Sequence, residues 1–200
     1  MERKDLAKRV ILVTGTPCVG KTSAARLLTS KLDALYINLT ELAVKDKLTM
    51  GKDEERDTII VDEDKMKKRI RDIIEETKKT QIVIDGHYAV SVVPPGFVSF
   101  VFVLRRDPVE LREFMKRCGF SEAKRDENLE SEILDLCLVE ALNTVETEKI
   151  CEMNVTGKTV VEIVDAMLDA MVHPDRCSVG AVDWLGKLES EGLLDEFLKT

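Results

Sequence analysis

The amino-acid sequence predicts a three-layer α/β fold, in which helices cover both faces of a central parallel five-stranded sheet. Two observations carry this prediction. Short β-branched runs alternate with longer amphipathic segments along the 200 residues, which is typical of strand–helix–strand units. The first run, VILV at 10–13, leads directly into the glycine-bounded stretch GTPCVGKT at 15–22. A buried strand followed by a glycine loop and a helix is typical of such a parallel sheet.

The individual elements follow from these patterns. The predicted strands are 10–13, 36–38, 82–85, 97–104 and 150–155. Apolar residues at helical spacing predict helices over 20–32, 62–79, 108–117, 121–149 and 158–172. Pro108 suits the first turn of its helix, and His173-Pro174 ends the last one. We therefore expect residues 1–175 to form one core.

Two segments are expected to lie outside the plain strand–helix alternation. Residues 38–61 are polar and irregular, and predict an excursion from the core. Residues 176–200 form a C-terminal tail with two short amphipathic pieces, one around Trp184 and one around Phe197. We expect this helical tail to pack on or near the core.

Composition and charge narrow the partners and the compartment. The formal net charge of −8 argues against strong direct nucleic-acid binding, but it suits a basic protein partner. The charged start MERKDLAKR and the proline-interrupted run around Pro94-Pro95 predict a cytoplasmic protein that does not enter a membrane. The five cysteines show no C-x-x-C spacing, so we expect reduced thiols with no zinc site.

The loop at 15–22 carries the clearest chemical signal, because it satisfies G-x-x-x-x-G-K-[ST] in full. Gly15 and Gly20 let the backbone wrap closely around phosphates, and successive N–H groups at a helix N-terminus face the anion. Lys21 supplies a cation for the β- and γ-phosphates, and the Thr22 hydroxyl suits Mg²⁺. The sequence therefore predicts a P-loop that holds ATP with Mg²⁺.

Two side chains near the next buried strand complete the predicted metal and transfer site. Asp85 directly follows IVI and is expected to hold the metal together with Thr22. His87 follows two residues later, where it would orient the attacking group. A strand-end turn for Asp85 and a hydrogen-bonded structural role for His87 are the alternative interpretations.

Cations are expected to gather around a transferring phosphoryl group, because its charge is spread over several oxygens. A basic series follows the predicted strand 97–104, and Gly119 interrupts it: Arg105, Arg106, Arg112, Arg117, Lys124 and Arg125. As single residues these suit a solvated helix face, and as a group they suit a lid that excludes water. Arg117 is the predicted catalytic cation, with Arg105 as a weaker candidate. A GTPase is not favoured, because no guanine-reading N-K-x-D is present. The arrangement is that of a nucleoside-monophosphate (NMP) kinase.

The ordered combination of motifs resembles the adenylate kinase isoenzyme 6 (CINAP) type of NMP kinase and ATPase, in an archaeal-like form. The motifs are GTP-x-VGKT at 15–22, YIN-x-x-x-LA at 36–43, DEE and DED at 53–55 and 62–64, D-x-H at 85–87, VLR at 103–105, and GF-S-x-x-K-x-x-EN-x-x-x-E at 119–132. They lie within about residues 8–172, so the resemblance covers nearly everything but the tail.

The resemblance implies specific roles for several segments. It implies an acceptor-binding insertion at about 38–61 and a lid at about 116–126. The implied ATP contacts are Gly15, Cys18, Gly20, Lys21, Thr22 and Ser23, with Lys158 beside the adenine. It also implies phosphate transfer from ATP to AMP or another NMP acceptor, ATP hydrolysis, and a role in maturation of the pre-ribosomal small subunit through a basic platform ribosomal protein.

The sequence departs from the family pattern at two cysteines. Cys18 stands where the family loop usually has glycine, and Cys118 stands where the lid usually has its arginine. The lid arginine is thus shifted by one, to Arg117, which turns it by about 100° on a helix. Two rivals to the NMP kinase stay open. One is an assembly ATPase whose transfer to nucleotides is incidental, and the other is a P-loop kinase with a different small acceptor.

Overall fold

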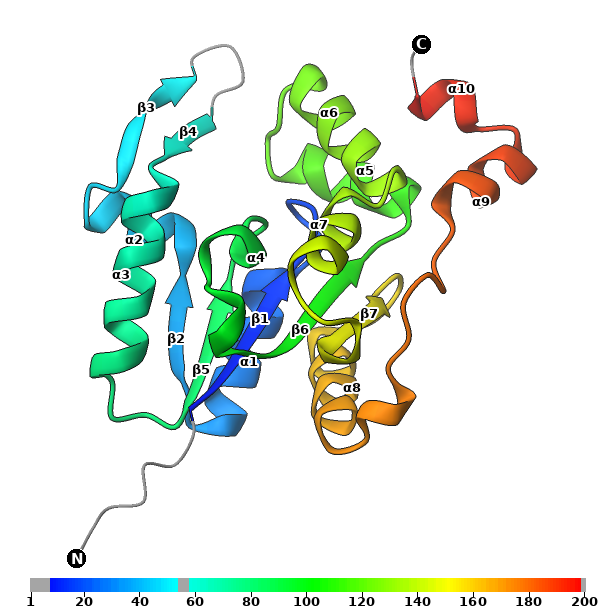
Figure 1. Cartoon of the computed structure of the whole chain (residues 1–200). Coiled ribbons are helices and arrows are strands. Elements are labelled where there is room, and N and C mark those ends of the chain that lie inside the picture. Colours follow the sequence, from blue (N-terminus) through cyan, green and yellow to red (C-terminus); the bar gives the residue numbers. More distant parts are fainter. Residues whose placement is uncertain (1–7, 54–57, 199–200) are drawn as a thin grey trace, which may run out of the picture.

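A central parallel sheet organises the molecule, as the computed structural model shows (Figure 1). The structure describes residues 8–53 and 58–198. The sheet has five strands in the order β2-β5-β1-β6-β7, and every neighbouring pair is parallel. Its strands are β1 (Arg9–Thr14), β2 (Leu35–Asn38), β5 (Gln81–Asp85), β6 (Val98–Arg105) and β7 (Ile150–Asn154). The predicted fold class and the predicted strands are therefore confirmed.

Helices cover both faces of the sheet (Figure 1). One hydrophobic cluster joins Ile11 and Val13 of β1 to α1, α5, α6 and α8, and the other joins Val10 and Leu12 to α2, α3, α4 and α7. The longer helices are α1 (Lys21–Leu32), α3 (Glu63–Glu76), α5 (Pro108–Arg117), α6 (Glu122–Ile133), α7 (Leu136–Thr144) and α8 (Val160–Val172). Because successive residues of β1 point to opposite faces, this strand is buried on both sides.

The short elements connect these layers. The short helical elements of the core are α2 (Leu39–Lys45), α4 (Ala89–Val92), η1 (Pro95–Phe97), η2 (Thr147–Lys149) and η3 (Pro174–Arg176). Residues 38–61 are not irregular as predicted. They contain α2 and the antiparallel pair β3 (Thr49–Asp53) and β4 (Thr58–Val61). Of the predicted acidic run 53–55, Glu54 and Glu55 lie outside the described residues.

The prediction of one long helix over 121–149 is wrong, because a turn interrupts the helix between α6 and α7. Leu134 ends α6, and Asp135 takes a left-handed conformation with φ 59°. The Asp135 carboxylate pairs with the buried guanidinium of Arg105. A tertiary ion pair therefore stabilises a turn that helical spacing alone did not reveal.

The C-terminal tail runs along β7 and ends beside α5 and α6. It carries α9 (Trp184–Glu191) and α10 (Leu194–Phe197), close to the two predicted amphipathic pieces (Figure 1). Trp184, Leu188 and Phe197 are buried in the same cluster as α5 and α6. Packing of the tail thus depends on these three apolar side chains.

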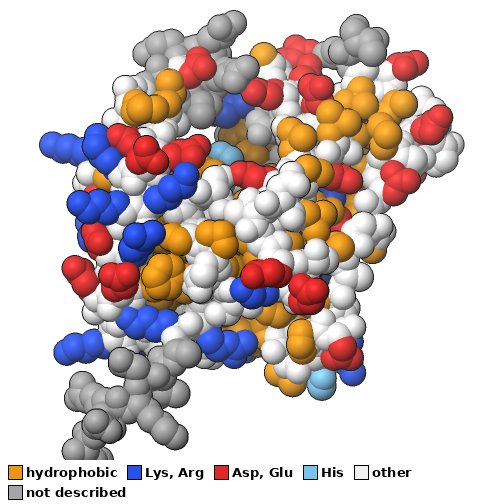
Figure 2. Space-filling view, in the orientation of Figure 1, with side chains coloured by type: hydrophobic (Ala, Val, Ile, Leu, Met, Phe, Trp, Pro, Cys, Tyr) orange, Lys and Arg blue, Asp and Glu red, His pale blue; other side chains and the backbone are white. Residues whose placement is uncertain are grey.

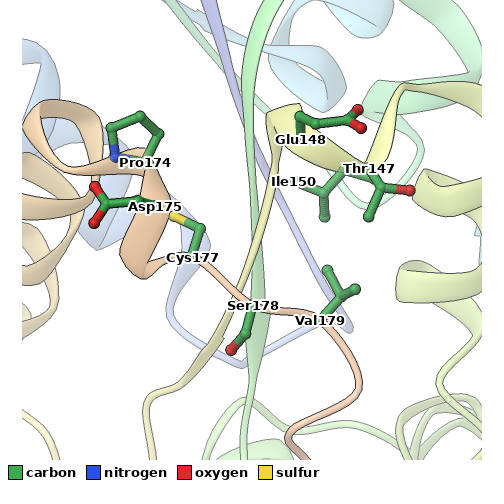
Figure 3. A pocket seen from close by; sticks show the side chains of 8 residues that line it. All are labelled: Thr147, Glu148, Ile150, Pro174, Asp175, Cys177, Ser178 and Val179. Carbon is green, nitrogen blue, oxygen red and sulfur yellow. The ribbon is translucent and has the colours of Figure 1, made fainter.

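One expectation about the cysteines is wrong, because Cys151 of β7 forms a disulfide with Cys177 at the start of the tail. The two residues are 26 apart in sequence, so no spacing rule identified them. A cavity of about 480 Å³ lies beside this bridge, and Figure 3 shows Cys177 and Val179 of the tail opposite Glu148 and Ile150. Cys18, Cys118 and Cys137 are free thiols.

Within the described residues, no helix combines the length and the apolar character that a membrane crossing needs.

Candidate active site

The parallel arrangement brings the carboxyl ends of β1, β2, β5 and β6 to the same end of the sheet. Val13 of β1 lies opposite Asp85 of β5, and Asn38 of β2 lies opposite the same aspartate. Arg105 ends β6 on the other side of β1. The loop after β1 therefore begins between the two polar strand ends.

The backbone of this loop requires glycine at its first position. Gly15 has φ 133°, and a Cβ there would lie 2.4 Å from the carbonyl oxygen of Leu104. Gly20, with φ 109°, precedes the first residue of α1. Cys18 has φ 69°, a left-handed conformation that favours glycine and explains why its position is usually glycine in the family pattern.

Lys21 lies buried at the start of α1, with its ammonium group directed back into the loop. Its Nζ donates to the carbonyl oxygen of Thr16 at 2.8 Å. Burial lowers the pKa of Lys21, while the nearby carboxylate of Asp85 acts in the opposite direction. The cation is therefore held at the loop by hydrogen bonding and by the Asp85 charge.

Asp85 is the focus of a small hydrogen-bond cluster at the end of β5. Its Oδ2 accepts from the Thr22 hydroxyl at 2.7 Å, the Asn38 amide at 2.9 Å and the Tyr36 hydroxyl at 3.0 Å. The carboxylate is buried. Tyr36 and Asn38 were not predicted to act in the site, although both belong to the YIN motif.

The oxygen donors of Thr22 and Asp85 fit Mg²⁺, which prefers hard oxygen ligands and keeps several waters. Within the described residues, no group of three or more His, Cys, Asp or Glu side chains could hold a metal ion. A hydroxyl, a carboxylate and substrate phosphates form the sparse ligand set expected of Mg²⁺ at a P-loop.

A cavity of about 400 Å³, here called the donor cavity, lies on one side of the loop. Its lining residues are Cys18, Gly20, Lys21, Thr22, Ser23, Arg106, Phe114, Lys158, Thr159, Val160 and Ile163. The structure thus brings Lys158, from the turn after β7, to the same space as the loop residues predicted to hold ATP. Gly15 lies deeper, at the end of β1.

A second cavity of about 550 Å³, here called the acceptor cavity, opens on the other side of Pro17. Its lining residues are Pro17, Thr40, Ala43, Ile59, Val61, His87, Tyr88, Phe120, Lys124, Glu127, Asn128 and Ser131. Figure 2 shows the molecule hollowed in its upper part, between the side of the β3–β4 hairpin and that of α6, with hydrophobic side chains inside. The insertion after β2 and the helix α6 thus face each other across this space.

His87 stands at the wall of the acceptor cavity in its neutral form. Burial by the surrounding protein and the charges of Lys21 and Lys124 lower its pKa to about 4, although the Asp85 carboxylate opposes them. His87 is nevertheless exposed at the cavity. Near neutral pH, His87 can donate and accept hydrogen bonds without carrying charge.

Arg105 and Arg117, two of the predicted cations, occupy very different places. Arg105 is buried, and its guanidinium donates to Glu132 Oε1 at 2.9 Å and to Glu152 Oε1 at 2.7 Å. Carboxylates of the core hold it, and it lines neither cavity, so the structure does not support its suggested role at the phosphoryl group. Arg117 is exposed and lines a separate cavity of about 690 Å³ between α5 and α9.

Arg106 is the arginine that reaches the loop, although it was not selected from the basic series. Its Nε donates to the carbonyl oxygen of Val19 at 3.2 Å, and its guanidinium lies 4.7 Å from the centre of the Phe114 ring. It also pairs with Glu110. Adjacent residues at a strand end point in opposite directions, so Arg105 faces the core when Arg106 faces the loop.

The P-loop after the first strand of a parallel sheet, with a cavity on each side, defines a P-loop kinase fold. A gluconokinase from Sinorhizobium meliloti has this fold, with a TM-score of 0.53 and 16% identity over 84% of this chain and 93% of its own. A shikimate kinase from Acinetobacter baumannii has a TM-score of 0.56 and 14% identity over 86% and 96%. These likenesses concern the fold alone.

Sequence relatives identify the family. Residues 11–135 match the AAA domain family. The chain is 37% identical over 177 residues to a Methanocaldococcus jannaschii protein named "Putative adenylate kinase", covering 88% of this chain and 93% of that one. A Saccharolobus solfataricus protein of the same name is 33% identical over 193 residues, covering 95% of each chain. The chain belongs to this family of archaeal adenylate-kinase-like proteins.

Proposed function

We propose that the protein is a Mg²⁺-dependent NMP kinase, which transfers the γ-phosphoryl group of ATP to AMP or another nucleoside monophosphate. The observation that carries the proposal is the placement of the loop between two cavities. Cys18 and Lys21 line the donor cavity, and Pro17 lines the acceptor cavity. A kinase needs two adjoining sites, because donor and acceptor must meet in line at the phosphoryl group.

The donor side is assigned to the loop and its neighbours. Lys21 and the loop N–H groups would hold the β- and γ-phosphates, with Ser23 at the first turn of α1 and Lys158 beside the adenine. Thr22 and Asp85 would hold Mg²⁺, Asp85 through water. When bound, the metal neutralises charge that develops on the transferred group and its leaving oxygen.

The acceptor side is assigned to the cavity between α2, β4 and α6. Its walls combine apolar side chains such as Ala43 and Ile59 with polar groups at one end, as small-molecule sites do. The Tyr88 hydroxyl is buried with no hydrogen-bond partner among the described residues, and a polar group of the acceptor would satisfy it. Neutral His87 would orient the attacking phosphate oxygen.

Cations from the lid and from the end of β6 would surround the transferred group. Lys124 of α6 lines the acceptor cavity, and its charge adds to the burial that lowers the pKa of His87. Arg106 lines the donor cavity. Arg117 would reach the phosphoryl group only if the carboxyl end of α5 turned inward, so we assign it a part in the closed form of the lid, here residues of about 116–126.

The finer functional assignments also remain proposals. ATP hydrolysis would follow whenever water replaces the acceptor in an incompletely closed site. The alternative is a ribosome-assembly ATPase, in which a basic small-subunit platform ribosomal protein stimulates turnover and the pre-ribosomal small subunit is the target. The net charge of −8 favours a basic partner.

A coupled assay of ADP formation separates the two functions. ADP production from ATP and Mg²⁺ is measured alone, with AMP, and with a basic platform ribosomal protein. The kinase proposal predicts a large stimulation by AMP and two ADP formed per AMP consumed. If AMP gives no extra turnover while the basic protein does, the assembly ATPase stands instead.

The site assignment is tested with Lys21→Ala. Loss of the loop cation should abolish ADP formation with and without AMP, because charge on the β- and γ-phosphates would be unopposed. Lys79→Ala is the matched control, since Lys79 is exposed and pairs with Asp33 away from both cavities. Wild-type turnover in Lys21→Ala would exclude the loop as the donor site.

A further inference from the structure

The carboxylate of Glu132 joins three parts of the chain that lie far apart in sequence. Its Oε2 accepts from the Thr16 hydroxyl at 2.5 Å, in the P-loop. Its Oε1 accepts from Arg105 Nε at 2.9 Å and from the Arg106 amide at 3.0 Å, at the end of β6. The same Oε1 accepts from the indole Nε1 of Trp184 at 3.0 Å, in the C-terminal tail. One buried carboxylate thus links the nucleotide loop to the tail.

The link continues from Glu132 to the loop cation. The Thr16 side chain donates to Glu132, while the Thr16 carbonyl oxygen accepts from Lys21 Nζ at 2.8 Å. Thr16 therefore lies between the carboxylate and the lysine that would hold the phosphates. A shift of the Glu132 carboxylate would move Thr16, and with it the position from which Lys21 acts.

The tail supplies this contact from a firmly held position. Trp184 is 5% exposed, and Leu188 is fully buried one turn further along α9. Lys187 pairs with the Asp107 carboxylate at 2.9 Å, at the N-terminal end of α5. Among the described residues that line the donor and acceptor cavities, none comes from the tail.

We infer that Trp184 is a positioning residue for ATP binding: its indole N–H fixes the Glu132 carboxylate, which holds Thr16 and the loop in their binding geometry. The inference rests on the proposed function of the loop as the ATP site. Trp184 lines neither cavity, and its indole N–H donates to Glu132, so we expect its effect on ATP binding to pass through this carboxylate. Thr16 contacts Lys21, which lines the donor cavity and not the acceptor cavity, so acceptor binding should change less than ATP binding.

The test uses Trp184→Phe, which keeps an aromatic ring in the buried site and removes the N–H donor together with the second ring of the indole. Binding of a non-hydrolysable ATP analogue with Mg²⁺, and separately of AMP, is measured by calorimetry in the full-length protein. Since the lost hydrogen bond goes to a charged acceptor that keeps other donors, we expect about fivefold to tenfold weaker binding of the ATP analogue. AMP affinity should stay within about twofold of wild type.

A matched tail variant separates positioning from general attachment of the tail. Glu196→Gln weakens the ion pair between Glu196 of α10 and Arg112 of α5, and leaves Glu132 untouched. It should bind the ATP analogue as the wild type does. Equal losses for the ATP analogue and AMP in Trp184→Phe, together with a lower melting temperature, would show a merely structural role and overturn the inference.

Fluorescence provides an independent reading, because Trp184 is the single tryptophan of the chain. In the wild type, the ATP analogue should change the tryptophan emission and AMP should not. Thr16→Val removes the hydroxyl that joins the loop to Glu132, and should abolish this response while Trp184 stays buried. A wild type that binds no ATP analogue would refute the proposed function, whereas a Trp184→Phe variant that binds it normally would refute only the inference.

Discussion

Replacing Arg105 by Met tests whether this arginine stabilises the fold or acts in phosphoryl transfer. Arg105 is 1% exposed, and its guanidinium contacts the side chains of Glu132, Glu152 and Asp135. The side chains of Glu132 and Glu152 are 1% and 0% exposed, so the substitution would leave two buried carboxylates without their cation. Methionine fills much of the volume but offers no donor.

The expected cost follows from the burial of this network. Removing one partner of a buried ion pair typically destabilises a protein by about 3–5 kcal/mol, because the remaining charge stays desolvated. A domain of this kind has a free energy of unfolding of about 5–15 kcal/mol in total. Arg105→Met should therefore remove a large fraction of the stability, and the urea midpoint should fall accordingly.

Urea unfolding followed by circular dichroism measures this loss. Arg176→Met serves as the control, because Arg176 and Asp169 form an ion pair whose side chains are 62% and 51% exposed. Such a surface pair should contribute less than about 1 kcal/mol. A stable Arg105→Met protein, within about 1 kcal/mol of wild type but with phosphoryl transfer abolished, would refute the structural role and restore Arg105 as a catalytic candidate.

Three further predictions follow from single features. Because the pKa of His87 lies at about 4, below its ordinary value of 6.5, the unfolded chain binds more protons between these values. The stability of the fold should fall as the pH drops from 6.5 to 4, and the fall should be smaller in His87→Gln. An NMR titration that gives His87 a pKa above 6.5 would contradict this. The disulfide between Cys151 and Cys177 joins residues that are 26 apart in sequence, so its reduction should lower the stability by about 3–4 kcal/mol. Reductant should not change the stability of the Cys177→Ser variant. Gly15→Ala should lower the stability by about 1–3 kcal/mol and weaken ATP binding, since the new Cβ would lie 2.4 Å from the Leu104 carbonyl oxygen. Gly96→Ala is the control and should change neither, because a Cβ there meets no atom within 4 Å.

The central strands and the loop could be predicted because local sequence determines them. VILV and IVI are short, continuous apolar runs, and the loop needs glycine where its backbone passes close to Leu104. Parallel pairing then places Asp85 beside the loop without further information. The prediction that Thr22 and Asp85 lie together is confirmed by their 2.7 Å hydrogen bond, while their role at a metal stays a prediction.

The remaining features depend on contacts between distant segments. Helical spacing predicted a continuous helix through Asp135, and only its pairing with Arg105 explains the left-handed break. The choice between Arg105 and Arg106 was likewise beyond local sequence, since the two are adjacent and equally basic. Carboxylates from α6 and β7 decide it, by holding Arg105 in the core.

The same contacts determine which end of α6 is fixed. Glu132 and Ile133 are buried at its carboxyl end, where Glu132 bonds to the loop, to β6 and to the tail. At the opposite end, Glu122 is exposed and Lys124 is half-buried at the acceptor cavity. A lid that closes over an acceptor is expected to pivot where buried contacts hold it. In the proposed closure of the lid we therefore expect Glu132 to stay fixed, because the loop, β6 and the tail all bond to its carboxylate, and Lys124 to be a cation of α6 that faces the acceptor.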